Sequence, residues 1–259
     1  MPPKKKAEKK EEKEESPEMV EWYKKIPSKF LNSSFNPNFE QHHLNLPFRI
    51  LITGSSGSGK TQTFLSLMRA FSGSFEKIII IARMASEPIF SWLNEEYKDK
   101  GIEVIEGTLS KLPDLNSMDK TVQTCLLLDD QITSSAKEMK VLSEWFIRAR
   151  KFNVSLIFIT QIYHEVPRIM RLQMTTVICK ALGSRRDLAA IIREYSGDYS
   201  KEDMEYFYKL CTAEKKNFMM IDAESFDPKY KIRYNFTPIQ DHIACLSGKA
   251  ACPEGDAKL

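Results

Sequence analysis

The sequence predicts an α/β fold in which a mostly parallel sheet carries helices on both faces. Short apolar runs alternate with helical patterns along most of the chain, as in proteins whose parallel strands are joined by helices. The runs are nearly continuous in Ile, Leu and Val, which is typical of strands buried on both faces. A glycine-rich segment, GSSGSGKT at 54–61, lies between the first apolar run and the first helical pattern.

The expected elements follow this alternation. Strands are expected over 48–53, 77–82, 103–106, 123–128, 155–160 and 175–182, and helices over 60–71, 86–98, 136–150 and 185–195. A further helix at 201–211 precedes two strands, 217–221 and 231–235, which are expected to form a hairpin or to extend one edge of the sheet.

The segment 54–61 matches G-x-x-x-x-G-K-[ST], the P-loop that binds a nucleoside triphosphate. Its glycines let backbone N–H groups face phosphate oxygens, and the N-terminus of the following helix favours negative charge. Lys60 is expected to reach the β- and γ-phosphates, and Thr61 to place its hydroxyl on Mg²⁺. A flexible loop is the alternative, but it leaves the flanking strand and helix unexplained. The motif therefore predicts that a nucleoside triphosphate binds with Mg²⁺, with nucleotide contacts from Gly54, Ser55, Ser56, Gly57, Ser58, Gly59, Lys60 and Thr61.

The segment 124–130, TCLLLDD, is an apolar run that ends in two acids and has the form of a Walker B strand. Asp129 is expected to hold Mg²⁺ beside Thr61. Asp130 is expected to orient or deprotonate the attacking water. The alternative is an Asp-Asp turn or helix cap after a core strand.

Three more polar residues are candidates for catalysis. Gln161 ends a predicted strand, and ligands bind beyond the carboxyl ends of parallel strands, so Gln161 is expected to sense the γ-phosphate or to position water. Arg148 and Arg150 end the preceding predicted helix. One of them could reach the ATP of a neighbouring subunit as an arginine finger, or both could serve only to favour a helix C-terminus.

Composition narrows the class of protein. The net charge of +3 over 259 residues is too small to argue for nucleic-acid binding by itself. No apolar run approaches the ~20 residues of a membrane span, and the Lys- and Glu-rich N-terminus does not resemble a secretory signal. None of the five cysteines lies in a C-x-x-C pair, which predicts a reducing compartment with neither disulfides nor zinc.

Four strings together, GSSGSGKT, LLLDD, FIRARKFNVSLIFITQ and VPRIMRLQMTTVI, resemble the DNA-packaging ATPases of poxviruses, other large double-stranded DNA viruses and virophages. That family belongs to the FtsK/HerA group of ring-forming P-loop ATPases, and the resemblance covers about residues 46–236. It implies a RecA-like P-loop NTPase fold of the ASCE class. It also implies Walker A roles for Lys60 and Thr61, a Mg²⁺ role for Asp129, a sensor role for Gln161 and a trans-acting finger at Arg148 or Arg150. Asp130 stands where related cellular motors carry Glu.

The function that the resemblance implies is ATP-driven translocation of double-stranded DNA into a preformed capsid by a homo-oligomeric ring, pentameric or hexameric. Its partners would be DNA and capsid proteins, and its place the virion or a viral factory in the host-cell cytoplasm. A DNA helicase or translocase of replication or repair, and a nucleotide-gated assembly or scaffold protein, are the alternatives. Candidate DNA contacts, which could instead form a solvated basic face, are Arg168, Arg171, Arg185, Arg186, Lys151 and Lys180.

Composition and motifs divide the chain into four parts. Residues 1–17 form a charged tail that is expected to be disordered, because it holds almost no hydrophobic residues. Residues 18–46 mix aromatic residues with Pro and Asn and are expected to dock on the core or on a neighbouring subunit. Residues 47–236 form the predicted P-loop ATPase domain, and residues 237–259 a C-terminal tail.

Overall fold

The computed structural model describes residues 20–27 and 34–248. They fall into two units, Met1–Ser33 and Ser34–Leu259. The described part of the first unit contains the short helix α1 (Trp22–Lys25). The charged tail predicted at 1–17 lies outside the described residues.

The second unit is built on one sheet, which has nine strands among the described residues, in the order β3-β2-β4-β5-β1-β6-β7-β8-β9. The strands from β3 to β6 in this order pair in parallel, whereas β7, β8 and β9 pair antiparallel at one edge. The strands are β1 (Arg49–Thr53), β2 (Lys77–Ala82), β3 (Ile102–Glu106), β4 (Thr124–Asp129), β5 (Val154–Thr160), β6 (Thr176–Cys179), β7 (Met219–Asp222), β8 (Ile232–Tyr234) and β9 (Thr237–Pro238).

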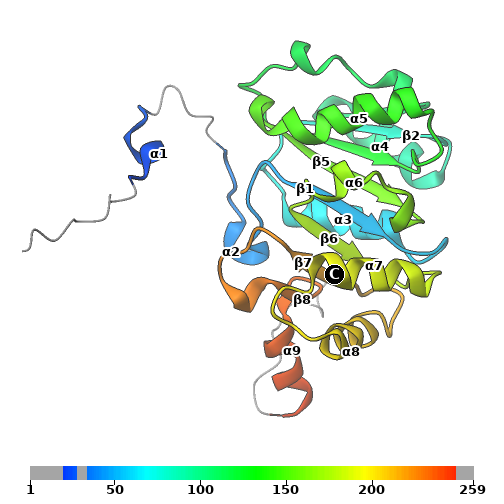
Figure 1. Ribbon diagram of the computed structural model, residues 1–259. Helices are drawn as coiled ribbons and strands as arrows, with labels where there is room; N and C mark the ends of the chain where they lie inside the picture. Colours follow the sequence, from blue (N-terminus) through cyan, green and yellow to red (C-terminus); the bar gives the residue numbers. More distant parts are fainter. Residues whose placement is uncertain (1–19, 28–33, 249–259) are drawn as a thin grey trace, which may run out of the picture. The chain divides into compact units, whose positions relative to one another are not determined.

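Helices cover both faces of this sheet (Figure 1). The helices of the second unit are α2 (Phe39–His42), α3 (Lys60–Ala70), α4 (Pro88–Tyr97), α5 (Ala136–Arg148), α6 (Arg168–Arg171), α7 (Arg185–Tyr195), α8 (Lys201–Cys211) and α9 (Ile239–Leu246). Buried side chains of α3 and α4 pack on one face, and those of α5, α6, α7 and α8 on the other. The predicted α/β class, with a mostly parallel sheet covered on both sides, is confirmed.

Alternate residues of the central strands explain this two-sided core. In β1, Leu51 joins the α5 side whereas Ile50 and Ile52 join the α3 side, and all three are fully buried. Successive side chains of a strand point to opposite faces, so a strand covered by helices on both sides needs apolar residues at every position. This requirement produces the unbroken Ile, Leu and Val runs of the sequence.

The sheet order places the P-loop at the centre of the fold. β1 pairs with β5 on one side and β6 on the other, and β5 pairs with β4. Because these four strands are parallel, their carboxyl ends lie at one edge of the sheet. The residues that follow β1, β4 and β5 therefore meet there, as expected for a ligand site in a parallel sheet.

The two ends of the second unit are tied to each other. Arg233 on β8 is fully buried, forms an ion pair with Asp222 and donates to the backbone carbonyl oxygens of His42 and His43. The described residues from 34 to 46 therefore pack on the sheet unit. Whether a domain boundary lies at residue 46 stays a prediction.

Sequence and structure differ near the C-terminus. The segment predicted to be a tail from residue 237 contains β9, which pairs with β8, and α9, whose Ile239 is fully buried. An eight-residue helix with one fully buried anchor gives too short a periodic pattern to be found from sequence.

The prediction that the cysteines form no disulfide fails at one of them. Cys125, Cys179 and Cys211 are buried and free, as the sequence predicts. Cys245 is disulfide-bonded, so the prediction of a chain without disulfides is wrong there. No C-x-x-C spacing marks this cysteine in the sequence.

No helix among the described residues combines the length and apolar character that a bilayer crossing requires.

Candidate nucleotide-binding site

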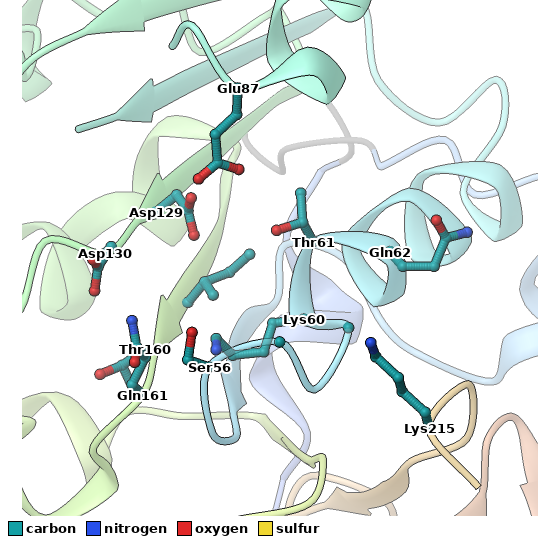
Figure 2. A pocket seen from close by; sticks show the side chains of 13 residues that line it. Ser56, Lys60, Thr61, Gln62, Glu87, Asp129, Asp130, Thr160, Gln161 and Lys215 are labelled. Atoms are coloured by element: carbon teal, nitrogen blue, oxygen red, sulfur yellow. The ribbon is translucent and has the colours of Figure 1, made fainter. Parts of the chain in front are cut away.

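A cavity of about 470 Å³ opens at the carboxyl edge of the parallel strands (Figure 2). The P-loop and the first turn of α3 form one wall, and the ends of β4 and β5 form the other. Glu87, which precedes α4, and Lys215, which follows α8, complete the lining. The volume lies in the range of small-molecule and cofactor sites.

Backbone geometry explains the glycines of the P-loop. Gly57 and Gly59 have φ values of 69° and 91°, in the left-handed region that favours glycine. A Cβ on Gly54 would lie 2.6 Å from Cβ of Lys180 and 2.7 Å from Oγ of Ser58. These three positions therefore have no room, or no low-energy conformation, for a side chain.

Lys60 begins α3 and turns back over the loop. Its Nζ donates to the backbone oxygens of Gly54 at 3.0 Å and Ser55 at 2.9 Å. Burial lowers the pKa of this ammonium, whereas Asp129 and Asp130 act to raise it. The ammonium is thus held inside the loop by neutral acceptors, where phosphate oxygens would be stronger partners.

Asp129 and Thr61 approach the cavity from opposite walls, and Figure 2 shows their oxygens facing each other across it. Burial, together with the nearby charges of Glu87 and Asp130, raises the pKa of Asp129 to about 6, although Lys60 acts to lower it. A cation between these acidic groups would relieve their repulsion, so the residues fit Mg²⁺. Among the described residues, no group of three or more His, Cys, Asp or Glu could hold a metal.

Asp130 and Gln161 lie side by side at the ends of β4 and β5 (Figure 2). Asp130 has a left-handed φ of 52°, which turns the chain directly after the strand and leaves the carboxylate exposed in the cavity lining. Its backbone N–H donates to Ile159 at 3.3 Å, and its backbone oxygen accepts from Nε of Arg83 at 2.9 Å. The backbone of Asp130 is thus held at both its N–H and its carbonyl group.

Arg148 and Arg150 do not reach this cavity. They precede β5, at the edge opposite to its carboxyl end, and the seven residues of β5 span about 20 Å. Arg148 donates to Oδ1 of Asn116 at 3.0 Å, and Arg150 pairs with Glu224 at 2.9 Å.

The predicted DNA contacts occupy different environments. Arg168, Arg185 and Arg186 are exposed, and the last two begin α7 at the same edge as the nucleotide cavity. Arg171 is ion-paired with Glu194 and lies over the ring of Tyr163, so its guanidinium is less available to bind a DNA phosphate.

The structure rules out Lys180 as a DNA contact and gives less support to Lys151. Lys180 is 1% exposed and donates to two backbone oxygens, so its assignment to a DNA surface is wrong. Lys151 is exposed but lies in the turn before β5, away from α7.

The sequence analysis did not predict two charged residues of the cavity, Glu87 and Lys215, or the further lining residues Gln62, Ile159 and Thr160. Glu87 lies within a segment that was predicted only as the start of a helix, and its signal is its place beyond the end of β2, the strand beside β4. Lys215 carries no motif. Its position depends on the antiparallel edge, which folds back beside the P-loop.

The fold and this site define a P-loop NTPase. Within that class, the chain belongs to the family described as Poxvirus A32 protein, whose model matches residues 36–235.

Among its relatives are the proteins named DNA packaging protein OPG160 from Variola virus and from Vaccinia virus, each 26% identical over 141 residues. The match covers 51% of this chain and 52% of each relative, so the chain spans about half the length of the curated relatives it matches.

The fold also matches a solved structure, the genome packaging NTPase B204 from Sulfolobus turreted icosahedral virus 2 in complex with AMPPCP. The TM-score is 0.52 at 18% identity, over 73% of this chain and 97% of that one. The structure of the same protein with sulfate gives a TM-score of 0.50 at the same identity, over 73% and 96%. At this identity the match bears on the fold alone.

Proposed function

We propose that this chain is an ATPase that drives double-stranded viral DNA into a preformed capsid. The observation that carries the proposal is that Lys60, Thr61 and Asp129 line one cavity, in a chain whose relatives are named DNA packaging proteins. The working form would be a homo-oligomeric ring, a pentamer or hexamer, that contacts DNA and capsid proteins. It would act in the virion or in a viral factory in the host cytoplasm.

Each residue of the cavity has a role in the proposed hydrolysis. P-loop N–H groups and Lys60 would hold the phosphates, and Thr61 and Asp129 would hold Mg²⁺, which neutralises charge on the phosphate oxygens. Asp130 would accept a proton from a water oriented by Gln161. The water oxygen would form the new bond to the γ-phosphorus while the bond from phosphorus to the β–γ bridging oxygen breaks. The products are ADP and inorganic phosphate.

An arginine finger would complete the site from the next subunit. Arg148 and Arg150 lie at the edge opposite to their own cavity, so we propose that one of them stabilises transition-state charge on the ATP of a neighbour. Two inactive proteins are then expected to complement each other. Lys60→Ala keeps its finger, and Arg148→Ala,Arg150→Ala keeps its nucleotide site, so mixed rings should regain ATPase activity. Mixed assembly without regained activity would contradict a finger acting in trans.

Duplex DNA is expected to stimulate ATP turnover and to bind without sequence preference. Exposed Arg185 and Arg186 would contribute phosphate contacts. Each phosphate contact adds about 0.9 to the slope of log affinity against log salt. Arg185→Ala,Arg186→Ala should therefore lower that slope by about 2, and Arg193→Ala, at the other end of α7, should leave it unchanged.

Binding titrations on unrelated duplexes at several salt concentrations, with ATPase assays in parallel, separate the three functions. A flat salt response would contradict phosphate-dominated DNA binding. Strand separation on a forked substrate would favour the helicase. ATP binding with negligible turnover, whether or not DNA is present, would favour the scaffold.

A further inference from the structure

A buried lysine lies directly beneath the P-loop. Lys180 follows β6, its side chain is 1% exposed, and its backbone N–H donates to the oxygen of Thr53 at 2.8 Å. A Cβ on Gly59 would lie 3.8 Å from both Cε and Nζ of Lys180, so the side chain runs along the underside of the loop. Burying an ammonium costs free energy unless strong acceptors meet it. The ammonium of Lys180 therefore needs hydrogen-bond acceptors placed close to it.

The partners of Lys180 lie in the turn between α8 and β7. Its Nζ donates to the backbone oxygens of Lys215 at 2.7 Å and Asn217 at 2.8 Å. The backbone oxygen of Lys215 would in turn lie 3.5 Å from a Cβ on Gly59. One buried ammonium thus fixes this turn against the P-loop.

The fixed turn presents one side chain to the nucleotide cavity. Lys215 lines the cavity and, in Figure 2, extends toward the junction of the P-loop with α3, near Gln62. Its neighbour Lys216 is in a different situation, because its side chain is 74% exposed and pairs with Glu214 at 3.5 Å. Both lysines are exposed, but of the two only Lys215 lines the nucleotide cavity.

The orientation of a bound nucleotide in the cavity follows from the residues expected to surround its γ-phosphate. Asp129, Asp130 and Gln161 lie at the end of the cavity where the γ-phosphate belongs. The α-phosphate and the nucleoside must then extend past the first turn of α3, which is the end where Lys215 lies. We propose that Lys215 is a second phosphate-binding cation that contacts the α-phosphate, and that Lys180 is the positioning residue that holds it there. This deepens the proposed function and rests on it only for nucleotide binding.

Nucleotide affinity tests the proposal without any need for turnover. Lys215→Ala should raise the Kd for ATP and for ADP about tenfold alike, the effect of losing one charged hydrogen bond, because both nucleotides carry the α-phosphate. Lys216→Ala is the matched control and should change neither Kd by more than about twofold. A loss confined to ATP would place Lys215 at the γ-phosphate and overturn the assignment. Equal affinities in Lys215→Ala and wild type would overturn it as well.

A double-mutant cycle tests the role of Lys180. Lys180→Met keeps an unbranched side chain as far as the ε position and removes the ammonium, so it should weaken ATP binding to the same degree as Lys215→Ala. Adding Lys215→Ala to Lys180→Met should then change the Kd by less than about twofold, because the side chain is already misplaced. A full tenfold loss on the Lys180→Met background would overturn the positioning role.

Two controls keep the results distinct. If Lys180→Met does not fold, as judged by circular dichroism, the comparison of Lys215→Ala with Lys216→Ala decides the proposal. Wild-type protein that binds no ATP would overturn the proposed function and this inference together. Normal ATP binding with no effect of Lys215→Ala would overturn this inference alone.

Discussion

Lys60→Ala is expected to abolish ATP turnover while the protein stays folded. The Lys60 ammonium is held by the backbone oxygens of Gly54 and Ser55, in the concave part of the loop where the β- and γ-phosphates belong. Lys215 lines the same cavity from its other end and cannot replace it. Loss of one electrostatic contact to the transition state costs about 10²–10³ in rate, so turnover should fall at least a hundredfold.

The measurement is the steady-state rate of phosphate release with saturating Mg²⁺ and ATP. Arg69→Ala is the matched control, because Arg69 is an exposed cation at the other end of α3. The control should keep the wild-type rate. Near wild-type turnover in Lys60→Ala would show that hydrolysis takes place elsewhere in the protein, and the site assignment would be wrong.

The parts of the fold that the sequence predicts are those with a local signal. β1, β4 and β5 are nearly continuous apolar runs, and Gly54 to Thr61 is a contiguous motif, so each can be found from its own residues. The alternation of strands and helices predicts the mostly parallel sheet, but general rules leave several strand orders, and the observed order comes from the structure. Asp129 and Asp130 come directly after a strand, so their place at the nucleotide edge needs no knowledge of distant contacts.

The parts that the sequence does not predict depend on contacts between distant residues. Lys180 has the composition of a surface cation, and it is buried because Lys215 and Asn217, more than thirty positions away, supply its acceptors. Arg171 also looks available for DNA until α7 brings Glu194 beside it. A charged residue is informative only once its neighbours are known, because burial and pairing change what its charge can do.

The second large effect is expected for a substitution of Asp130, the carboxylate directly after β4. Asp130→Asn should keep ATP affinity and lose most of the hydrolysis, by about 10²–10⁴, because an amide cannot accept the proton of the attacking water. Asparagine also tolerates the left-handed φ of 52°, so the turn after the strand is preserved. The loss should therefore report on chemistry rather than on the backbone.

Glu87 is the matched comparison, because it is the other exposed carboxylate of the cavity. It acts on the charge of Asp129 and lies on the far side of that residue from Gln161 (Figure 2), so it would lie by the proposed Mg²⁺ rather than by the proposed attacking water. Glu87→Gln should raise the Mg²⁺ concentration needed for half-maximal rate and lower the saturated rate less than tenfold. Single-turnover rates and ATP affinities for both variants distinguish the roles. If Asp130→Asn loses ATP affinity with an unchanged rate per bound ATP, Asp130 is a metal ligand; if Glu87→Gln has the larger loss at saturating Mg²⁺, Glu87 is the base.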